Sequence, residues 1–555
     1  MRRTRKGGVH RETGMSRRDL LQAGVVGGIA VAAGSALGAG GRAEAAAAAT
    51  VPAFELEEAT IAELQEGMHA GRHTARSLTE AYLARIEAVD RAGPTLRSVI
   101  EVNPDALALA NALDDERKAR GARGPLHGIP VLIKDNIATS DRMMTTAGSL
   151  ALAGAVAPRD SFVADQLRKA GAVILGKTNL SEWANFRSSR SSSGWSGRGG
   201  QCANPYALDR NPCGSSSGTG AAVSANLAAA GVGTETDGSI VCPSHACSLV
   251  GIKPTVGLVS RSGIVPISHT QDTAGPMARS VADAAALLTA LAGVDPSDGA
   301  TAAGRGKATD YTKFLDPNGL KGARIGVARA KLFGYSPYAD ALVEAAVKEM
   351  GRLGALVVDP ADIPHLGEYD DSEFEVLLYE FKADLNAYLA EWAKGAPVRT
   401  LAEVIAFNEA NREKELPYFA QDIMEKAQKK GPLSDKPYLK ALAQCARLSR
   451  EKGLDAVMAK HGLDAIVAPT GSPPWVTDLV NGDHFLGASS TPAAVSGYPS
   501  ITVPAGYSYG LPVGITFIGR PWGEGSLIRL AYAFEQATKV RRPPRLLPTA
   551  DLSRS

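Results

Sequence analysis

The most unusual stretch of the chain runs from Asn211 to Ile240 and reads NPCGSSSGTG-AAVSANLAAA-GVGTETDGSI. Glycine and hydroxyl residues this dense cost backbone entropy and bury little apolar surface. They nevertheless flank an apolar segment, residues 221–230, which is typical of a helix, and they run into strand residues, so the stretch is not a flexible linker. A turn that brings backbone amides close to a reacting oxygen accounts for the glycines better.

Other chemistries find less support in the spacing. A phosphate-binding loop is not indicated, because the pattern G-x-x-x-x-G-K-[ST] is absent and no lysine follows the Gly/Ser run. Cys242, His245 and Cys247 offer two thiols and an imidazole, but no second pair of metal ligands stands near them. The G-x-S-x-G pattern at 214–218 lacks a preceding apolar strand, and the S-x-x-K pattern at 449–452 lies in a charged helical stretch without its companion motifs. A serine nucleophile activated by a lysine remains.

Several motifs, in a fixed order along the chain, carry a family resemblance. The sequence resembles the amidase signature family through GIPVLIKDNI (128–137), GKTNLSE (176–182), NPY (204–206), the Gly214–Gly220 run, TDGSI (236–240), GIKPT (251–255) and GPMAR (275–279). The resemblance covers nearly the whole chain after the N-terminal segment. It implies an α/β/α sandwich, in which helices cover both faces of a central mixed sheet, and a hydrolase that needs no cofactor and no metal.

Carried over by motif, the resemblance implies a catalytic set of Lys134, Ser215 and Ser239, with Ser215 at a cis peptide bond and Ser239 as the nucleophile. The residue types fit this chemistry, because a serine hydroxyl is a weak nucleophile that needs a base. Lysine is a base only when neutral, so Lys134 must lose its charge by burial at the end of the apolar run 129–133. The hydroxyl of Ser215 both accepts and donates, and it can relay a proton between the other two groups.

Neighbouring positions are expected to complete the site. The oxyanion hole is expected to consist of the backbone N–H groups of Thr236, Asp237, Gly238 and Ser239. Ser216 is expected to support the site through a hydrogen bond. Three positions depart from the usual family residue: Ser217 and Asp237 stand where many members have glycine, and Val241 stands where many have arginine.

Hydrophobic patterning separately predicts an α/β fold. Short apolar runs bounded by Gly or Pro predict buried strands at residues 129–133, 172–175, 232–236, 251–259, 325–328, 355–358, 465–468, 501–504 and 513–518. Helical stretches such as 280–291 and 340–351 lie between them, which favours a sheet covered on both faces. Residues 366–460 are rich in Glu, Lys, Ala and Leu and predict a helical insertion over one face of the sheet. Residues 50–545 are expected to form one catalytic domain.

The N-terminal segment predicts export. Residues 1–45 carry eight basic and three acidic side chains, and a pair of arginines (17–18) precedes a Gly/Ala-rich stretch that ends in Ala-Glu-Ala at 43–45. This is typical of a twin-arginine signal peptide, and six glycines within residues 20–40 argue against a stable membrane anchor. Without the segment, 52 basic and 55 acidic residues leave a net charge of −3, so no nucleic-acid partner is expected. Export implies an oxidising compartment; the five cysteines allow at most two bridges, and most are expected to be buried fillers.

Three segments point to the substrate. PCGSSSG (212–218), ETDGSIVC (235–242) and LYEFKADL (378–385) resemble the peptide amidase branch of the family, which removes ammonia from the C-terminal carboxamides of peptides. The expected substrate is therefore a peptide amide or an amino-acid amide. A general aliphatic or aryl amidase is the alternative. A glutamine amidotransferase subunit is opposed by the export signal and the charge, and a non-catalytic binding protein is opposed by the intact catalytic set.

Overall fold

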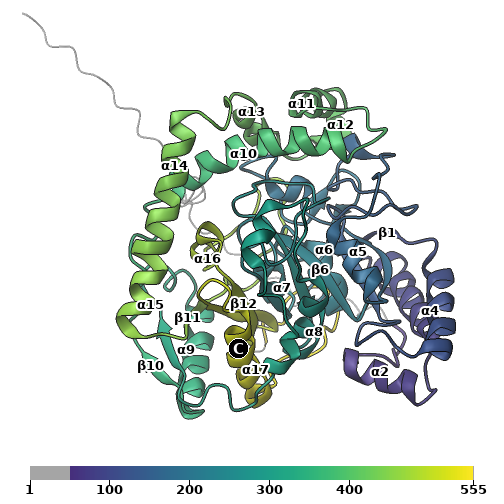
Figure 1. Ribbon diagram of the computed structural model, residues 1–555, viewed down its shortest axis with the longest axis horizontal. Coiled ribbons are helices and arrows are strands. Elements are labelled where there is room, and N and C mark those ends of the chain that lie inside the picture. The colour runs from purple at the N-terminus through teal and green to yellow at the C-terminus, as the bar shows by residue number, and fades with distance from the viewer. Residues whose placement is uncertain (1–50, 554–555) are drawn as a thin grey trace, which may run out of the picture.

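The computed structural model describes residues 51–553, so the predicted signal peptide at residues 1–45 lies outside the described residues. An 11-stranded sheet runs through the molecule, and helices pack on both of its faces (Figure 1). In spatial order its strands are β1 (Val99–Val102), β3 (Val173–Thr178), β2 (Pro130–Lys134), β6 (Ala230–Glu235), β8 (Thr273–Ala278), β7 (Val250–Lys253), β12 (Ser500–Ser508), β13 (Leu511–Ile518), β11 (Ala465–Pro469), β9 (Arg324–Val327) and β10 (Leu356–Val358). The sheet is mixed, because β2 and β9 each pair in parallel with both neighbours while the other pairs are antiparallel. The predicted α/β sandwich is confirmed.

Helices connect and cover these strands. They are α2 (Ile61–His69), α3 (Ala75–Arg85), α4 (Ala106–Arg120), α5 (Phe162–Lys169), α6 (Ser217–Ser224), α7 (Val241–Ala246), α8 (Val281–Leu291), α9 (Pro337–Arg352), α10 (Asp370–Glu391), α11 (Leu401–Ala410), α12 (Arg412–Glu415), α13 (Asp422–Gln428), α14 (Lys436–Ala446), α15 (Asp455–His461), α16 (Thr491–Ser496) and α17 (Glu524–Thr538). A π-helix, Arg447–Leu454, joins α14 to α15. Within residues 51–553, no helix combines the length and the apolar character that crossing a bilayer requires.

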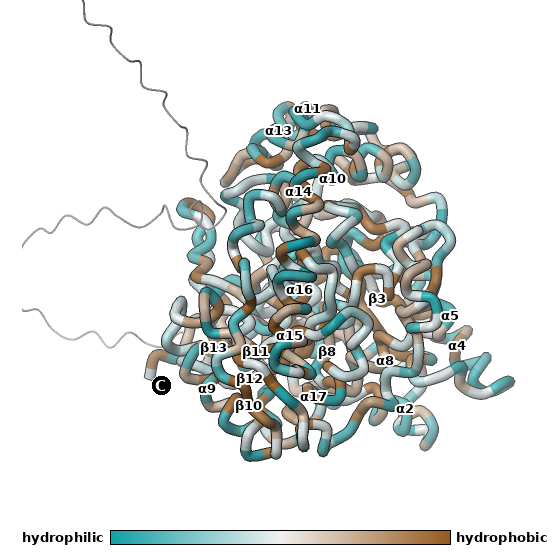
Figure 2. The backbone as a smooth tube through the Cα atoms, turned by 60° about the vertical axis from the view of Figure 1, so that its left-hand side comes forward, coloured by the Kyte–Doolittle hydropathy of each residue, from teal (hydrophilic) through white to brown (hydrophobic). Residues whose placement is uncertain are grey.

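The two faces of the sheet are distinguished by strand alternation. On β13, Phe517 belongs to the main core and packs near Phe534 of α17. Its neighbour Ile518 points to the other face, where it shares a cluster with Met458 of α15 and Ala493 of α16. Figure 2 shows hydrophobic stretches of the tube in this region of β10–β13. A different set of helices therefore packs on each face of the sheet.

Glycines line the face on which α6 and α7 lie. A Cβ added at Gly251 of β7 would stand 2.3 Å from the Ser244 hydroxyl of α7. A Cβ at Gly233 of β6 would stand 2.8 Å from the Ser216 hydroxyl at the start of α6. Any larger residue would push these helices off the sheet, so the glycines let the Gly/Ser-rich segment approach the strand ends closely.

The insertion at 366–460 is helical, but its position differs in part from the expectation of a cover over one face. Helices α10–α13 form a layer at one end of the molecule in both views (Figures 1 and 2). Apolar residues of α10, among them Phe381 and Leu385, cluster with Trp183 and Phe186 in the loop after β3 and not with strand residues. Only the π-helix and α15 pack on a sheet face. The layer therefore covers the carboxyl ends of β2 and β3.

Each predicted strand overlaps an observed one, with several corrections. The run predicted as 251–259 forms a strand only to Lys253, because Pro254 cannot continue the ladder. β8 was missed because its sequence, TAGPMA, contains glycine and proline, and β1 was missed because it is short. The helix expected at 221–230 is instead α6, which spans Ser217–Ser224. Two residues after its end, Asn226 has a left-handed φ of 60°, so the helix does not continue to residue 230.

Candidate active site

Lys134 stands at the carboxyl end of β2 and is completely buried. Its Nζ donates to Ser215 Oγ at 2.7 Å and to Thr234 Oγ1 at 3.0 Å. Asn136 Nδ2 donates to the same Thr234 hydroxyl at 2.9 Å. Since β6 is the parallel neighbour of β2, the sheet itself brings Thr234 to the lysine. The amine is thus held between a strand residue and the serine that the sequence predicted as its partner.

Burial changes the charge state of this amine. Desolvation lowers the pKa of Lys134 from 10.5 to about 7, although the nearby carboxylates of Asp272 and Glu235 act to raise it. A pKa near 7 means that a large fraction of the side chain is uncharged at neutral pH. A neutral amine carries a lone pair, and at 2.7 Å from Ser215 Oγ Lys134 is close enough to accept a proton from that hydroxyl.

Ser215 and Ser216 lie in a tight turn before α6. The peptide bond between Gly214 and Ser215 is cis, at the position where the resemblance implied one. Ser216 Oγ donates to the Thr234 carbonyl at 3.1 Å and accepts from the Thr234 N–H at 3.2 Å. The Ser216 N–H donates to the Ser239 carbonyl at 3.1 Å. Ser216 therefore fastens the turn to β6 on one side and to the Ser239 turn on the other.

Ser239 lies in the turn between β6 and α7, where Gly238 has a φ of 80°. Its side chain is at the edge of the buried region, with 8% exposed. Within residues 51–553, the Ser239 hydroxyl makes no hydrogen bond, and none joins it to Ser215 Oγ. Catalytic hydrogen bonds often tighten only when a substrate binds, so the Ser239 hydroxyl stays a candidate nucleophile.

The expected oxyanion donors also face no partner. No hydrogen bond to the described part of the chain comes from the N–H groups of Thr236, Asp237, Gly238 and Ser239. The following two N–H groups, those of Ile240 and Val241, instead bind the buried Glu235 carboxylate at 2.8 and 3.0 Å. The turn therefore offers four neighbouring donors that an incoming anionic oxygen can use.

Side chains hold this turn in place. The Asp237 carboxylate accepts from Ser490 Oγ and, at 2.8 Å, from Thr491 Oγ1 at the start of α16. The Thr236 hydroxyl donates to Asp272 at 2.6 Å. Aspartate in place of the usual glycine at position 237 thus gives the turn an anchor without using its main-chain donor.

A small pocket opens beside the turn. Its polar lining includes Asn136, Thr234, Glu235, Thr236 and Asp272, and its apolar lining includes Ala184, Ile264, Val265 and Ile267. A neighbouring pocket shares Asn136, Ala184, Val265 and Ile267 and adds Trp183. The first pocket adjoins the turn through Thr236 and the second adjoins the first through their shared lining, but neither lining includes Lys134, Ser215 or Ser239.

The chain is similar to known proteins over most of its length. The family model described as Amidase matches residues 77–528. The chain belongs to the amidase signature family. The solved structure of native peptide amidase from Stenotrophomonas maltophilia is 53% identical, with a TM-score of 0.85, and the match covers 89% of this chain and 99% of that chain.

Two curated relatives extend the comparison. A probable amidase from Arabidopsis thaliana is 45% identical over 504 residues, which cover 89% of this chain and 93% of the relative. The glutamyl-tRNA(Gln) amidotransferase of Chloroflexus aurantiacus has a subunit that is 35% identical over 502 residues, 88% of this chain and 99% of the relative. The family and the structural neighbours support an amide-hydrolysing activity, so the protein is an amidase.

The amidase has one disulfide in its described part, between Cys213 and Cys242. It joins the residue two positions before Ser215 to the residue three positions after Ser239. Cys202, Cys247 and Cys445 are free and buried, as expected for fillers. Because Cys242 is oxidised, the metal-ligand alternative at 242–247 loses one thiol.

Sequence reasoning missed several residues of the site. Thr234, Asn136 and Asp272 received no role, and the pairing of Cys213 with Cys242 was left open. Asn136 and Asp272 lie in or beside matched motifs, GIPVLIKDNI and GPMAR, so their position was a usable signal. His245 proves structural: burial lowers its pKa to about 3, and its Nδ1 accepts from the Gly514 N–H at 3.3 Å.

The disulfide generates a prediction. Replacing both partners, Cys213→Ser with Cys242→Ser, should lower stability by about 3 kcal/mol, since it frees a loop of 29 residues, and should lower kcat because both serine turns are released. Thermal unfolding and steady-state kinetics of the double variant measure the two effects. Reductant should slow the wild type but not slow the double variant further. Unchanged kcat in the double variant would show that the bond does not position the serines.

Proposed function

We propose that this amidase hydrolyses the C-terminal carboxamide of peptides or amino-acid amides, with Lys134, Ser215 and Ser239 as its catalytic residues. The observation that carries the chemistry is the 2.7 Å hydrogen bond from the fully buried Lys134 Nζ to Ser215 Oγ. The 53% identity to a peptide amidase over nearly the whole described chain supports the substrate class.

The reaction begins with a proton relay. Neutral Lys134 takes the proton of Ser215, and Ser215 takes the proton of Ser239 as Ser239 Oγ attacks the carboxamide carbon. The carbonyl π electrons move to oxygen, and the resulting anion is bound by N–H groups of the turn 236–239. Stabilisation of that anion depends on donors that are already in place, since none of the four is used elsewhere in the described chain.

The tetrahedral intermediate then collapses. The C–N bond breaks, the proton held by Lys134 returns through Ser215 to the leaving nitrogen, and ammonia departs. The acyl group remains as an ester on Ser239. Water attacks this ester with the same relay acting as general base, and the peptide acid leaves with Ser239 restored. No cofactor or metal enters any of these steps.

We also propose that the chain is exported by the twin-arginine route. The basic residues before the Gly/Ala-rich stretch at 20–40 support this, and so does the Cys213–Cys242 bond, because structural disulfides persist in oxidising compartments. An exported enzyme would meet peptide amides and not a transfer-RNA-bound partner. The similarity to an amidotransferase subunit then reflects the common fold and chemistry.

The substrate proposal predicts a pattern of turnover. Incubation with an N-acetylated, C-terminally amidated dipeptide should release ammonia and the dipeptide acid, measured by ammonia assay and mass spectrometry. Benzamide, hexanamide and L-glutamine at the same concentration should react more slowly. Ser239→Ala and Lys134→Met should each lose about 10³-fold or more in kcat.

Other outcomes assign the protein differently. Faster turnover of benzamide or hexanamide than of the dipeptide amide would make it a general amidase. Turnover of glutamine alone would favour the amidotransferase. Absence of turnover together with no fluorophosphonate adduct on Ser239 would leave a binding protein.

The lysine predicts a pH profile. Because the protonated amine cannot accept a proton, kcat/KM should rise about tenfold per pH unit at low pH and level off above about 7, where Lys134 becomes neutral. An N-acetylated substrate keeps its own amine from titrating in this range. A profile that keeps rising to pH 10 would contradict a buried neutral lysine.

A further inference from the structure

Helix α10 places a buried carboxylate against the loop of residues 261–273, which lines the pocket beside the turn. Glu380 has no exposed surface, yet it is an acidic residue on a helix whose other buried residues are mostly apolar. Its Oε2 accepts from the Thr270 N–H at 3.1 Å, from Thr270 Oγ1 at 3.0 Å and from Ser268 Oγ. Its Oε1 accepts from the Tyr438 hydroxyl of α14 at 2.8 Å. Four donors therefore surround one carboxylate.

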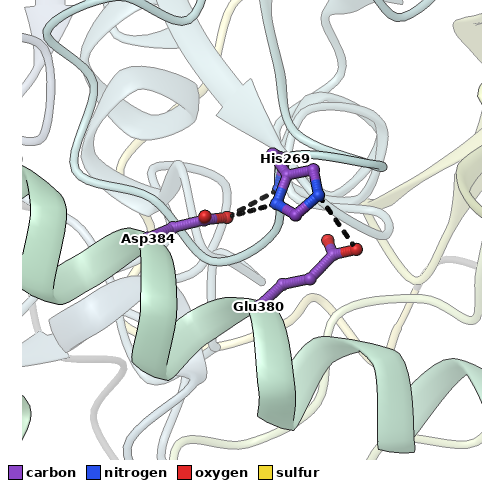
Figure 3. Close-up of side chains that lie close together, drawn as sticks. All are labelled: His269, Glu380 and Asp384. Carbon is purple, nitrogen blue, oxygen red and sulfur yellow. Dashed lines mark hydrogen bonds and ion pairs between the residues drawn. The ribbon is translucent and has the colours of Figure 1, made fainter. Parts of the chain in front are cut away.

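The imidazole of His269 lies between this carboxylate and the solvent. His269 Nδ1 lies 2.9 Å from Asp384 Oδ2, and its Nε2 lies 3.4 Å from Glu380 Oε1 (Figure 3). The His269 N–H also donates to Asp384 at 3.0 Å. The hydrogen bond to Asp384 raises the pKa of His269, although burial acts to lower it. Both ring nitrogens thus face carboxylates, and the cluster is satisfied by its own members.

The loop that Glu380 binds also forms hydrogen bonds with the proposed oxyanion turn, residues 236–239. Asp272 Oδ2 accepts from the N–H groups of Ile267 and Ser268 at 2.8 and 2.9 Å, which folds the loop onto itself. Asp272 Oδ1 accepts from the Thr236 hydroxyl at 2.6 Å. A second link runs through Gln271, whose amide donates to the Thr236 carbonyl at 3.4 Å and to Glu373 of α10 at 3.1 Å. The hydroxyl and the carbonyl of Thr236 therefore both form hydrogen bonds with residues of this loop.

Stability alone is a poor reason for this network. Taking a carboxylate out of water costs several kcal/mol, and a hydrophobic residue of similar size is often as stable or more so. A fully satisfied buried network does, however, fix one geometry among alternatives. The geometry fixed here is that of the first residue of the proposed oxyanion hole.

We propose that Glu380 is a positioning residue of this amidase: by holding Ser268 and Thr270 it keeps Asp272 on Thr236, and so fixes the first N–H of the oxyanion turn. The inference rests on the proposed function of that turn. Asp272 lines the same pocket as Thr236, and its charge acts on Lys134. The network thus reaches both the anion site and the base, while Glu380 itself touches neither.

The charged groups around the network are few. Glu380 faces His269, with Asp384 and the Tyr438 hydroxyl beside it. Asp272 faces Arg261 on its own loop, and its charge also acts on Lys134. Lys134 in turn faces Asp272 and Glu235. A displaced Asp272 would leave Lys134 without one of the two carboxylates that raise its pKa.

Glu380→Gln tests the proposal. An amide has one acceptor where the carboxylate has two, so it presents an NH₂ group to at least one of the donors. We expect kcat per active site to fall about tenfold, less than the roughly 10²–10³-fold cost of removing an oxyanion donor because this donor is displaced and not lost, with KM changed by less than about threefold. The acid limb of the pH profile should move to lower pH, because Asp272 would no longer raise the pKa of Lys134.

Glu375→Gln is the matched control on the same helix. Glu375 pairs with Lys430 at 2.6 Å and, among the described residues, makes no hydrogen bond or ion pair with the loop. This variant should therefore lose an ion pair of α10 while kcat and the acid limb stay unchanged. Active sites are counted with a fluorophosphonate label on Ser239. The label also gives a rate of its own, which should fall in Glu380→Gln because its phosphoryl oxygen uses the same turn.

The outcomes separate the explanations. A lower melting temperature with unchanged kcat, labelling rate and acid limb would make Glu380 a structural residue only and overturn the proposal. If Glu380→Gln does not fold, Ser268→Ala removes one donor to Glu380 and should show the same changes at smaller size; no change there would also overturn it. If the wild type hydrolyses no amide but labels on Ser239, the proposed function fails while the labelling rates still test Glu380.

Discussion

Burial of one amine is the constraint on which this active site depends. Lys134 ends a central strand, and the sheet, the Gly/Ser turn and the pocket loops leave its Nζ with no contact to solvent. Burial strongly disfavours the charged ammonium, and this desolvation lowers the pKa of Lys134 to about 7. The strand position that makes the side chain buried is therefore what makes it a base.

The surrounding structure serves to bring separate segments to that amine. Glycine at 233 lets the Ser215–Ser216 turn lie on β6, and the Cys213–Cys242 bond ties this turn to the one that carries Ser239. The loop 261–273 closes the pocket from another side and is itself held by α10. The helical insertion thus belongs to the active site through hydrogen bonds, although it supplies none of the three proposed catalytic side chains.

The sequence predicted the α/β sandwich because buried strands leave short apolar runs between Gly and Pro. The prediction missed β8, because Gly275 and Pro276 are unusual within a strand. In the structure β8 pairs with both of its neighbours, β6 and β7. The positions of Lys134, Ser215 and Ser239 came from motifs, since a lysine after a strand and serines in turns are common in any protein. The contacts of the remaining site residues could not be read from the sequence, because they join distant segments: Lys134 and Thr234 are 100 residues apart, and Thr236 and Asp272 are 36 apart. The disulfide was open for a similar reason, because five cysteines permit several pairings.

The most direct test is a titration of Lys134 itself. Protein labelled with ¹³C at the lysine ε carbons would be followed by NMR from pH 5 to pH 11, and the Lys134 resonance would be assigned as the one absent from Lys134→Met. That assignment separates it from the buried Lys177 and Lys253, whose pKa values burial lowers only to about 8. The account predicts a midpoint near 7 for Lys134. A midpoint near the unperturbed value of about 10.4 would contradict it, because a charged lysine cannot accept the proton that the reaction requires.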